Sequence, residues 1–213
     1  TADSDNFYGK FKDSEPSVRR LDNKMGGSLW PNRDLAASGY AAVWARDNTR
    51  AEIYDALARR EVYASSGPRI VVRFFAGWNL PEDLDKAPDV VEQGYALAVP
   101  MGGDLPAAPT DTDGPVFVIL AEKDALGAGL DRVQVIKGWL DEAGKLHEKI
   151  YDVALSDGRK PDANGKVPPV GNTVDLKTAT YTNSIGDTQL SAMWTDPDFD
   201  PKQRAFYYAR VLE

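Results

Sequence analysis

The chain has 213 residues, a formal net charge of −8 and a hydrophobic fraction of 42%, which indicates one large or two small folded domains with a sizeable core. The acidic balance disfavours nucleic acid as a partner, because binding phosphate groups needs a basic face. Cysteine is absent from the sequence, which excludes disulfides and cysteine-ligated metal sites. The apolar runs are shorter than the about 18 residues that a membrane-spanning helix needs.

The first 35 residues are polar and irregular, and we expect a long loop there with one helical turn after Glu15 and Pro16. Loops of this length usually carry function or contact a neighbouring part of the protein. The sequence starts without methionine at TADSDNFYGKF and stops at YYARVLE inside a strand-like segment. We therefore expect a fragment of a longer protein.

A strand, a helix and a second strand are predicted next along the chain. The apolar run GYAAVWA at residues 39–45 suits a strand buried on both faces. Thr49 and Glu52 form a T-x-x-E capping box, which predicts a helix that begins at this point. A turn of small residues follows the helix, and a strand-like segment ends at Phe75. This order is typical of an α/β arrangement.

The pattern changes after residue 76. Residues 76–115 are rich in Pro, Gly and Asp, which indicates a boundary, and PVFVILAE at residues 115–122 predicts a strand. Residues 131–155 predict a hairpin whose turn has Gly144 in a left-handed conformation. A polar loop and three strand-like segments, TATYTNSI, TQLSAMWTD and RAFYYARVLE, complete the chain. Strands without intervening helices predict an antiparallel β-sandwich or small barrel, so the fold class is α+β.

Few residues offer catalytic or metal-binding chemistry. His147 is the single histidine, and its position between Leu146 and Glu148 is typical of a surface strand residue. No serine lies in a G-x-S-x-G motif, which weakens a catalytic triad. The acidic segments lack the calcium-loop pattern, and DPDFDP at residues 196–201 reads as a turn.

The turn of small residues at 64–67 lies between Arg60 and Arg69. Serine and glycine can turn backbone N–H groups towards an anion, and arginine can contact it through two hydrogen bonds. The turn follows the carbonyl end of a helix, however, and this end repels anions. Both an anion site and a simple helix end before a strand therefore stay open.

Four long blocks are similar to the domain-of-unknown-function 3604 family. They are SGYAAVWARDNTRAEIYDALARREVYASSGPRIVVRFFAGW at 38–78, VPMGGDLP at 99–106, LDRVQVIKGWLDEAGKLHEKIYDVALSDGRKPDANGKVPPVGNTVD at 130–175 and WTDPDFDPKQRAFYYARVLE at 194–213. That family resembles the polymerase and histidinol phosphatase (PHP) superfamily of metal-dependent phosphoesterases, which use a distorted α/β barrel. The resemblance implies that residues 1–76 close such a barrel and that residues 77–213 form an accessory, mostly antiparallel β domain.

The resemblance also implies where the chemistry lies. Its metal-ligand motifs precede residue 1, so we expect divalent manganese, zinc or iron in the full-length protein, no cofactor in this fragment, and no hydrolysis by the fragment alone. Similar proteins have a Y-A-[ST]-[ST]-G segment near the barrel mouth, which implies substrate contacts from Arg60, Tyr63, Ser66 and Arg69. The expected partners are the upstream barrel portion and a small-molecule or saccharide ester of phosphate, sulfate or phosphonate. The family suggests a bacterial protein that is periplasmic or secreted, with the cytoplasm left open.

Two alternatives need no catalysis. Aromatic side chains on the predicted strands could bind a saccharide or an anionic polymer, although such side chains usually lie in the core. The candidates are Trp139, Tyr151, Trp194, Tyr207 and Tyr208. The β domain could instead brace the barrel or mediate dimerisation.

Overall fold

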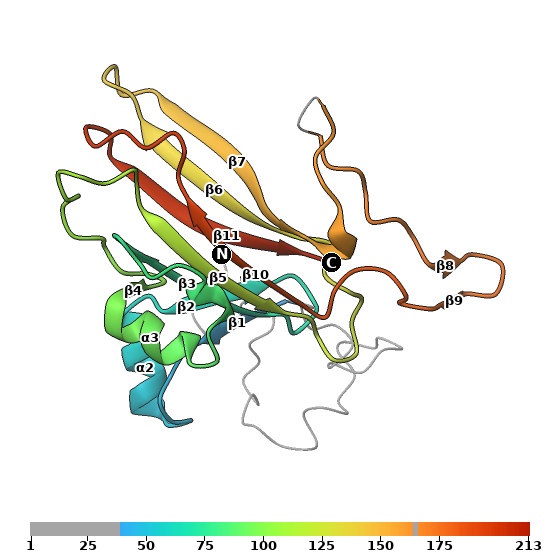
Figure 1. Ribbon diagram of the computed structural model, residues 1–213. Helices are drawn as coiled ribbons and strands as arrows, with labels where there is room; N and C mark the ends of the chain where they lie inside the picture. Colours follow the sequence, from blue (N-terminus) through green and yellow to red (C-terminus); the bar gives the residue numbers. More distant parts are fainter. Residues whose placement is uncertain (1–38, 164–165) are drawn as a thin grey trace, which may run out of the picture. The chain divides into compact units, whose positions relative to one another are not determined.

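Two antiparallel sheets dominate the computed structural model, which describes residues 39–163 and 166–213 (Figure 1). The four-stranded sheet has the order β10-β5-β3-β4, and the three-stranded sheet has the order β11-β6-β7. The strands of the first are β3 (Val71–Gly77), β4 (Val99–Pro100), β5 (Val116–Glu122) and β10 (Gln189–Thr195). Those of the second are β6 (Arg132–Leu140), β7 (Leu146–Leu155) and β11 (Ala205–Leu212). The prediction of mostly antiparallel β-structure is confirmed.

The main core lies between these two sheets. Its buried side chains include Phe74, Phe117 and Ile119 from the four-stranded sheet and Val133 and Val135 from the three-stranded sheet. The Phe117 ring lies 5.4 Å from the Phe74 ring. Alternate residues of each strand point to the same face, so the inner faces of the two sheets pack against each other as in a β-sandwich.

The hairpin β6–β7 has the predicted turn. Leu140 pairs with Leu146, and Gly144 has a φ of 75°, the left-handed region that glycine enters without steric cost. The Asp141 side chain accepts hydrogen bonds from the backbone N–H groups of Ala143 and Lys145 at 3.0 and 2.8 Å. The sequence therefore specifies both the position and the chemistry of this turn.

The N-terminal described residues form a two-stranded ribbon of β1 (Tyr40–Val43) and β2 (Val62–Ser65), with α2 (Arg50–Ala58) between the strands in sequence. Thr49 caps α2 as predicted, because its Oγ1 accepts a hydrogen bond from the Glu52 N–H. The expectation that residues 39–45 form a strand buried on both faces is wrong. The residues of β1 are exposed or half-buried, because among the described strands β1 pairs only with β2.

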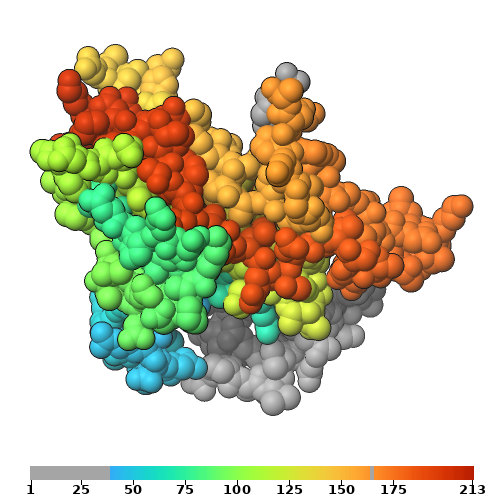
Figure 2. All heavy atoms as spheres, viewed as in Figure 1, coloured from blue at the N-terminus to red at the C-terminus, as the bar shows by residue number. Residues whose placement is uncertain are grey.

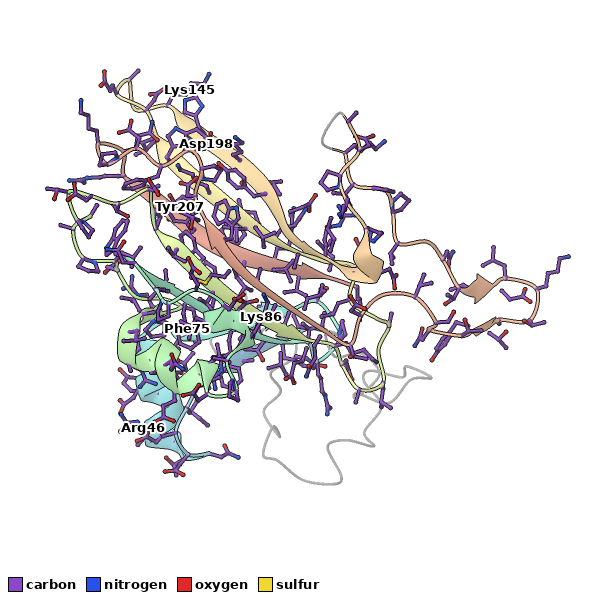
Figure 3. All side chains as sticks on the ribbon, viewed as in Figure 1. Arg46, Phe75, Lys86, Lys145, Asp198 and Tyr207 are labelled. Carbon is purple, nitrogen blue, oxygen red and sulfur yellow. The ribbon has the colours of Figure 1, made fainter. Side chains whose placement is uncertain are left out.

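The stretch 76–115, interpreted as a boundary, contains ordered elements. It forms η2 (Leu84–Lys86), α3 (Val90–Leu97) and β4. The helical elements η2 and α3 pack on the outer face of the four-stranded sheet, where Leu84 and Val90 cluster with Phe75, and Figure 3 labels Phe75 at α3. Gly94 of α3 makes this close packing possible, since a Cβ atom there would lie 2.9 Å from the Phe75 ring. The predicted division between residues 76 and 77 falls within β3.

Several further segments lie at the margins of this fold. The loop that follows β7 contains η3 (Ser156–Gly158) and the short strands β8 (Val174–Asp175) and β9 (Thr180–Tyr181). The loop and helical turn expected in residues 1–35 lie outside the described residues. In the part of the chain that the structure describes, no helix is long and apolar enough to cross a membrane.

Candidate functional site

A cavity of about 990 Å³ runs along β11, and we call it the β11 groove. One wall is β11 itself, residues 205–212, and a second wall is β2 with Ser66. The floor consists of alternate residues at the inner face of β3 and just before it, namely Ile70, Val72, Phe74 and Ala76. Figure 2 shows β11 in red beside the yellow hairpin β6–β7.

The two walls of the groove are strand edges. A cavity above a sheet face touches every second residue of a strand, because side chains alternate between faces. The β11 groove instead touches consecutive residues of both β2 and β11. Among the described residues, β2 pairs only with β1 and β11 pairs only with β6. The groove therefore follows the two unpaired strand edges.

Arg60 stands at the groove in a conformation that favours glycine. The Glu61 N–H donates to the Ala56 carbonyl and the Arg60 N–H to the Leu57 carbonyl, both at 3.0 Å, which ends α2 in a Schellman motif. Arg60 has a φ of 62°, which costs a residue with a Cβ atom about 1 kcal/mol. Its guanidinium lies 3.4 Å from Asp104, and both side chains are largely exposed, at 65% and 91%. The strained residue thus presents a cation to the groove.

We expect Arg60→Gly to be more stable than Arg60→Ala by about 1 kcal/mol, because only alanine retains the cost of a left-handed conformation. Both variants lack the pair with Asp104, so their difference reports the backbone at this position, including the greater freedom of glycine in the unfolded chain. Urea unfolding of the two proteins measures it. Equal free energies of unfolding would show that the position is not strained.

The other predicted substrate contacts divide between the groove and the surface beside it. Tyr63 and Ser66 line the groove with Arg60, whereas Arg69 does not. Burial of its ring raises the pKa of Tyr63. Ser65 builds the turn itself: its hydroxyl donates to the Pro68 carbonyl and accepts from the Gly67 N–H at 3.1 Å. The Arg69 backbone N–H donates to Asp124 at 2.7 Å. Three of the four predicted residues therefore share one cavity.

The sequence indicated Tyr207 and Tyr208 of β11 as binding candidates but not that this strand forms one cavity with Arg60, Tyr63 and Ser66. Phe206 and Tyr208 belong to it, with 58% and 43% of their surfaces exposed. Their rings are nearly parallel, with centroids 6.4 Å apart. The available signal in the sequence was the run of three aromatic residues at positions 206–208, and the structure exposes two of them, Phe206 and Tyr208.

Of the other aromatic candidates, Tyr207 also lines the groove, whereas Trp139, Tyr151 and Trp194 lie outside it. The Trp194 ring packs 5.6 Å from Phe117 and 4.8 Å from Tyr151, and the Trp139 ring stacks on His147 at 5.3 Å. Both tryptophans are half-buried. They are not fully enclosed in the core, and they do not form an exposed aromatic face together. Of the five predicted aromatic residues, Tyr208 is the exposed one.

A buried ionic network connects β6 to the turn before β11. Lys137 and Asp196, with side chains 2% and 0% exposed, form an ion pair at 2.6 Å. Lys137 also donates to the Asp198 carbonyl, and the Tyr207 hydroxyl donates to Asp196, each at 2.6 Å. Burial, together with the hydrogen bond to Asp196, raises the pKa of Tyr207, so this hydroxyl remains a donor at neutral pH. Figure 3 labels Asp198 and Tyr207 in this region.

The segment DPDFDP forms the predicted turn, since the Asp198 N–H donates to the Asp196 side chain at 2.9 Å. The buried pairing of Asp196 with Lys137 was not predicted. Lys149 and the Tyr151 hydroxyl bind the Asp198 carboxylate at the exposed rim of the network. Because every charged group of this network has a partner, we assign it a structural role and place the candidate site in the β11 groove.

Metal ligands do not cluster in residues 39–163 and 166–213, which contain no group of three or more His, Asp or Glu side chains that could hold an ion. His147 lies on β7 as predicted, and its Nε2 is 2.8 Å from Asp141. We therefore assign none of the described residues to the metal centre expected in the full-length protein.

The family model described as "Protein of unknown function (DUF3604)" matches residues 1–213. No curated protein and no solved structure matches the chain.

Proposed function

The chain belongs to the DUF3604 family over residues 1–213, and from this membership we propose that it is the ligand-binding part of a metal-dependent phosphoester hydrolase. In this proposal the β11 groove binds the substrate, and the manganese, zinc or iron ions lie in an upstream barrel portion of the full-length protein. The chain alone then has no metal-dependent hydrolytic activity. Its location is proposed to be the periplasm or the cell exterior.

The observation that carries the proposal is the position of Arg60 beside a large, mostly apolar groove. A guanidinium can donate two parallel hydrogen bonds to a tetrahedral anion such as phosphate, sulfate or phosphonate. The pair with Asp104 is exposed, so its contribution to stability is about 0–1 kcal/mol and an anion can compete for Arg60. Tyr63 and Ser66 add hydroxyl groups on the same wall, while the aromatic residues of β11 suit the organic part of an ester.

Binding of 1-naphthyl phosphate tests this arrangement, with 1-naphthyl sulfate and 1-naphthol as companions. We expect Arg60→Gln to weaken binding of both anions about tenfold or more, since hydrogen bonds to a charged group contribute about 1.5–3 kcal/mol. The neutral naphthol should be unaffected. Isothermal titration calorimetry measures all three ligands.

The matched control is Arg69→Gln, because Arg69 belongs to the same turn region but does not line the groove. This variant should bind both anions as the parent chain does. Equal losses in the two variants would indicate a general electrostatic effect and would contradict a site at Arg60. In the full-length protein, absence of both bound metal and manganese-stimulated hydrolysis would overturn the hydrolase assignment.

A second candidate function is a saccharide-binding or structural β module without catalysis. The exposed, parallel rings of Phe206 and Tyr208 favour it, because aromatic faces can stack on sugars. Tyr208→Ala should then abolish binding of soluble oligosaccharides, whereas Arg60→Gln should leave that binding intact. Glycan-array binding of the two proteins distinguishes this function from the first.

A further inference from the structure

We infer that the β11 groove binds an extended segment of a partner polypeptide, which adds to the three-stranded sheet as a further strand beside β11 and places an acidic or phosphorylated side chain against Arg60. The inference deepens the proposed function, since it rests on the groove being a ligand site and names the class of ligand. It is based on the unpaired edges of β11 and β2, the apolar inner face of β3 and the position of Arg60.

The number of strands in the two layers differs. Four strands of one sheet face three strands of the other. Phe74 on the inner face of β3 belongs to the core between the sheets, yet it also lines the groove with Val72 and Ala76. The inner face of β3 is therefore only partly covered by β11. A strand placed next to β11 in the same layer would lie over the rest of it.

The wall at β11 offers backbone groups to such a strand. β11 has eight residues, a length of about 27 Å at 3.4 Å per residue. Its described pairing is with β6 alone, so every second residue directs its N–H and C=O groups to the opposite edge. An unpaired strand edge of this length is a template for another extended chain. These groups supply affinity, while the apolar floor supplies pockets for alternate side chains.

The second wall decides what kind of occupant fits. β2 lines the far side of the groove with consecutive residues, Val62 to Ser65, and its described pairing is with β1 alone. A strand from a second folded copy would bring its own sheet edge and neighbouring strands into this wall. A single extended segment has two free edges and can pair with β11 on one side and face β2 on the other. The geometry therefore favours a segment over a domain.

Charge selects the chemistry of the segment. Among the residues that line the groove, Arg60 and Arg210 are cationic and Asp104 is anionic, although the whole chain carries a charge of −8. The groove is thus locally cationic on an acidic protein. Apolar residues at alternate positions would face Val72, Phe74 and Ala76, and an acidic or phosphorylated residue would compete with Asp104 for Arg60.

The experiment uses a display library of ten-residue peptides in which Val, Ile, Leu or Phe occupies every second position and one intervening position is aspartate. The selected peptide is synthesised with aspartate, phosphoserine or serine at that position and titrated into the 213-residue chain. We expect the aspartate and phosphoserine peptides to bind at least about tenfold more tightly than the serine peptide, a difference of about 1.4 kcal/mol. Arg60→Gln should remove this difference.

Backbone methylation tests strand addition directly. Two versions of the selected peptide carry N-methyl groups at the odd or at the even amides, which removes hydrogen-bond donors without changing the side chains. At least one version should lose binding, and hydrogen exchange at the β11 amides should slow when the unmethylated peptide binds. Retention of affinity by both versions would overturn strand addition, even if naphthyl phosphate binds and the proposed function stands.

Two exposed alanines provide matched variants. Ala64→Trp places an indole in the groove, and Ala58→Trp places one at the end of α2, away from the lining residues. Only Ala64→Trp should abolish peptide binding. If that variant does not fold, the methylated peptides still test the inference.

Failure to select any peptide whose binding Ala64→Trp removes would overturn the inference. A concentration-dependent dimer that Ala64→Trp disrupts would assign the groove to a second copy and would also overturn it.

Discussion

Lys137→Met is expected to lower the free energy of unfolding by about 3–5 kcal/mol, the usual cost of removing one partner of a buried ion pair. The side chain of Asp196 is fully buried and accepts hydrogen bonds from Lys137, Tyr207 and the Asp198 N–H. Without the ammonium group its negative charge stays buried and is only partly compensated. Urea unfolding at neutral pH, followed by tryptophan fluorescence, measures the loss.

The control for this prediction is Lys149→Met. Lys149 pairs with Asp198, and both side chains are about half exposed, so we expect a loss of about 0–1 kcal/mol. The two substitutions remove the same charge from neighbouring positions of the same network. Similar losses would show that burial of the Lys137 pair is not what matters.

Gly102→Ala is expected to destabilise the fold by about 2 kcal/mol or more, because it combines a left-handed backbone with a steric clash. Gly102 has a φ of 85°, and a Cβ atom there would lie 2.2 Å from the Arg60 carbonyl oxygen. That oxygen belongs to a strained turn, so it cannot move without disturbing the end of α2. We also expect weaker binding of naphthyl phosphate, since the same movement displaces Arg60.

Gly67→Ala is the matched control. A Cβ atom at Gly67 would have no atom within 4 Å, so its effect should stay within about 0.5 kcal/mol. Both glycines line or flank the groove region, so their difference measures the combined cost of the left-handed backbone and the close contact at Gly102. A tolerated Gly102→Ala would contradict the tight contact between residues 60 and 102.

The part of the fold that the sequence predicts is the part encoded locally. The β6–β7 hairpin carries its own turn residue in Gly144, and α2 carries its own cap in Thr49, so short-range patterns suffice. α3 was missed because prolines and aspartates precede it and because Gly94 weakens its helical pattern. That glycine is explained by Phe75, a contact between distant residues that no local pattern contains.

The same difference between local patterns and contacts of distant residues explains which parts of the candidate site were predicted. Arg60, Tyr63 and Ser66 come from one stretch of sequence, and the small-residue turn indicated them. β11 joins them from the far end of the sequence, and only the packing of the two sheets brings it there. The Lys137 pair could have been found, because Val133 and Val135 share its side of β6 and point into the core. Lys137 lies on the same face of β6 as these two valines, and a buried ammonium group needs a carboxylate partner.

The order of strands has a consequence for the synthesis of this protein. Each sheet ends in a strand from the last part of the sequence, β10 in one and β11 in the other. A nascent chain on the ribosome can form the β6–β7 hairpin early, since its contacts are local. Neither layer can close until residues 189–212 have left the exit tunnel. Until then β5 and β6 expose apolar edges and faces, so this protein should depend on chaperones until these residues emerge.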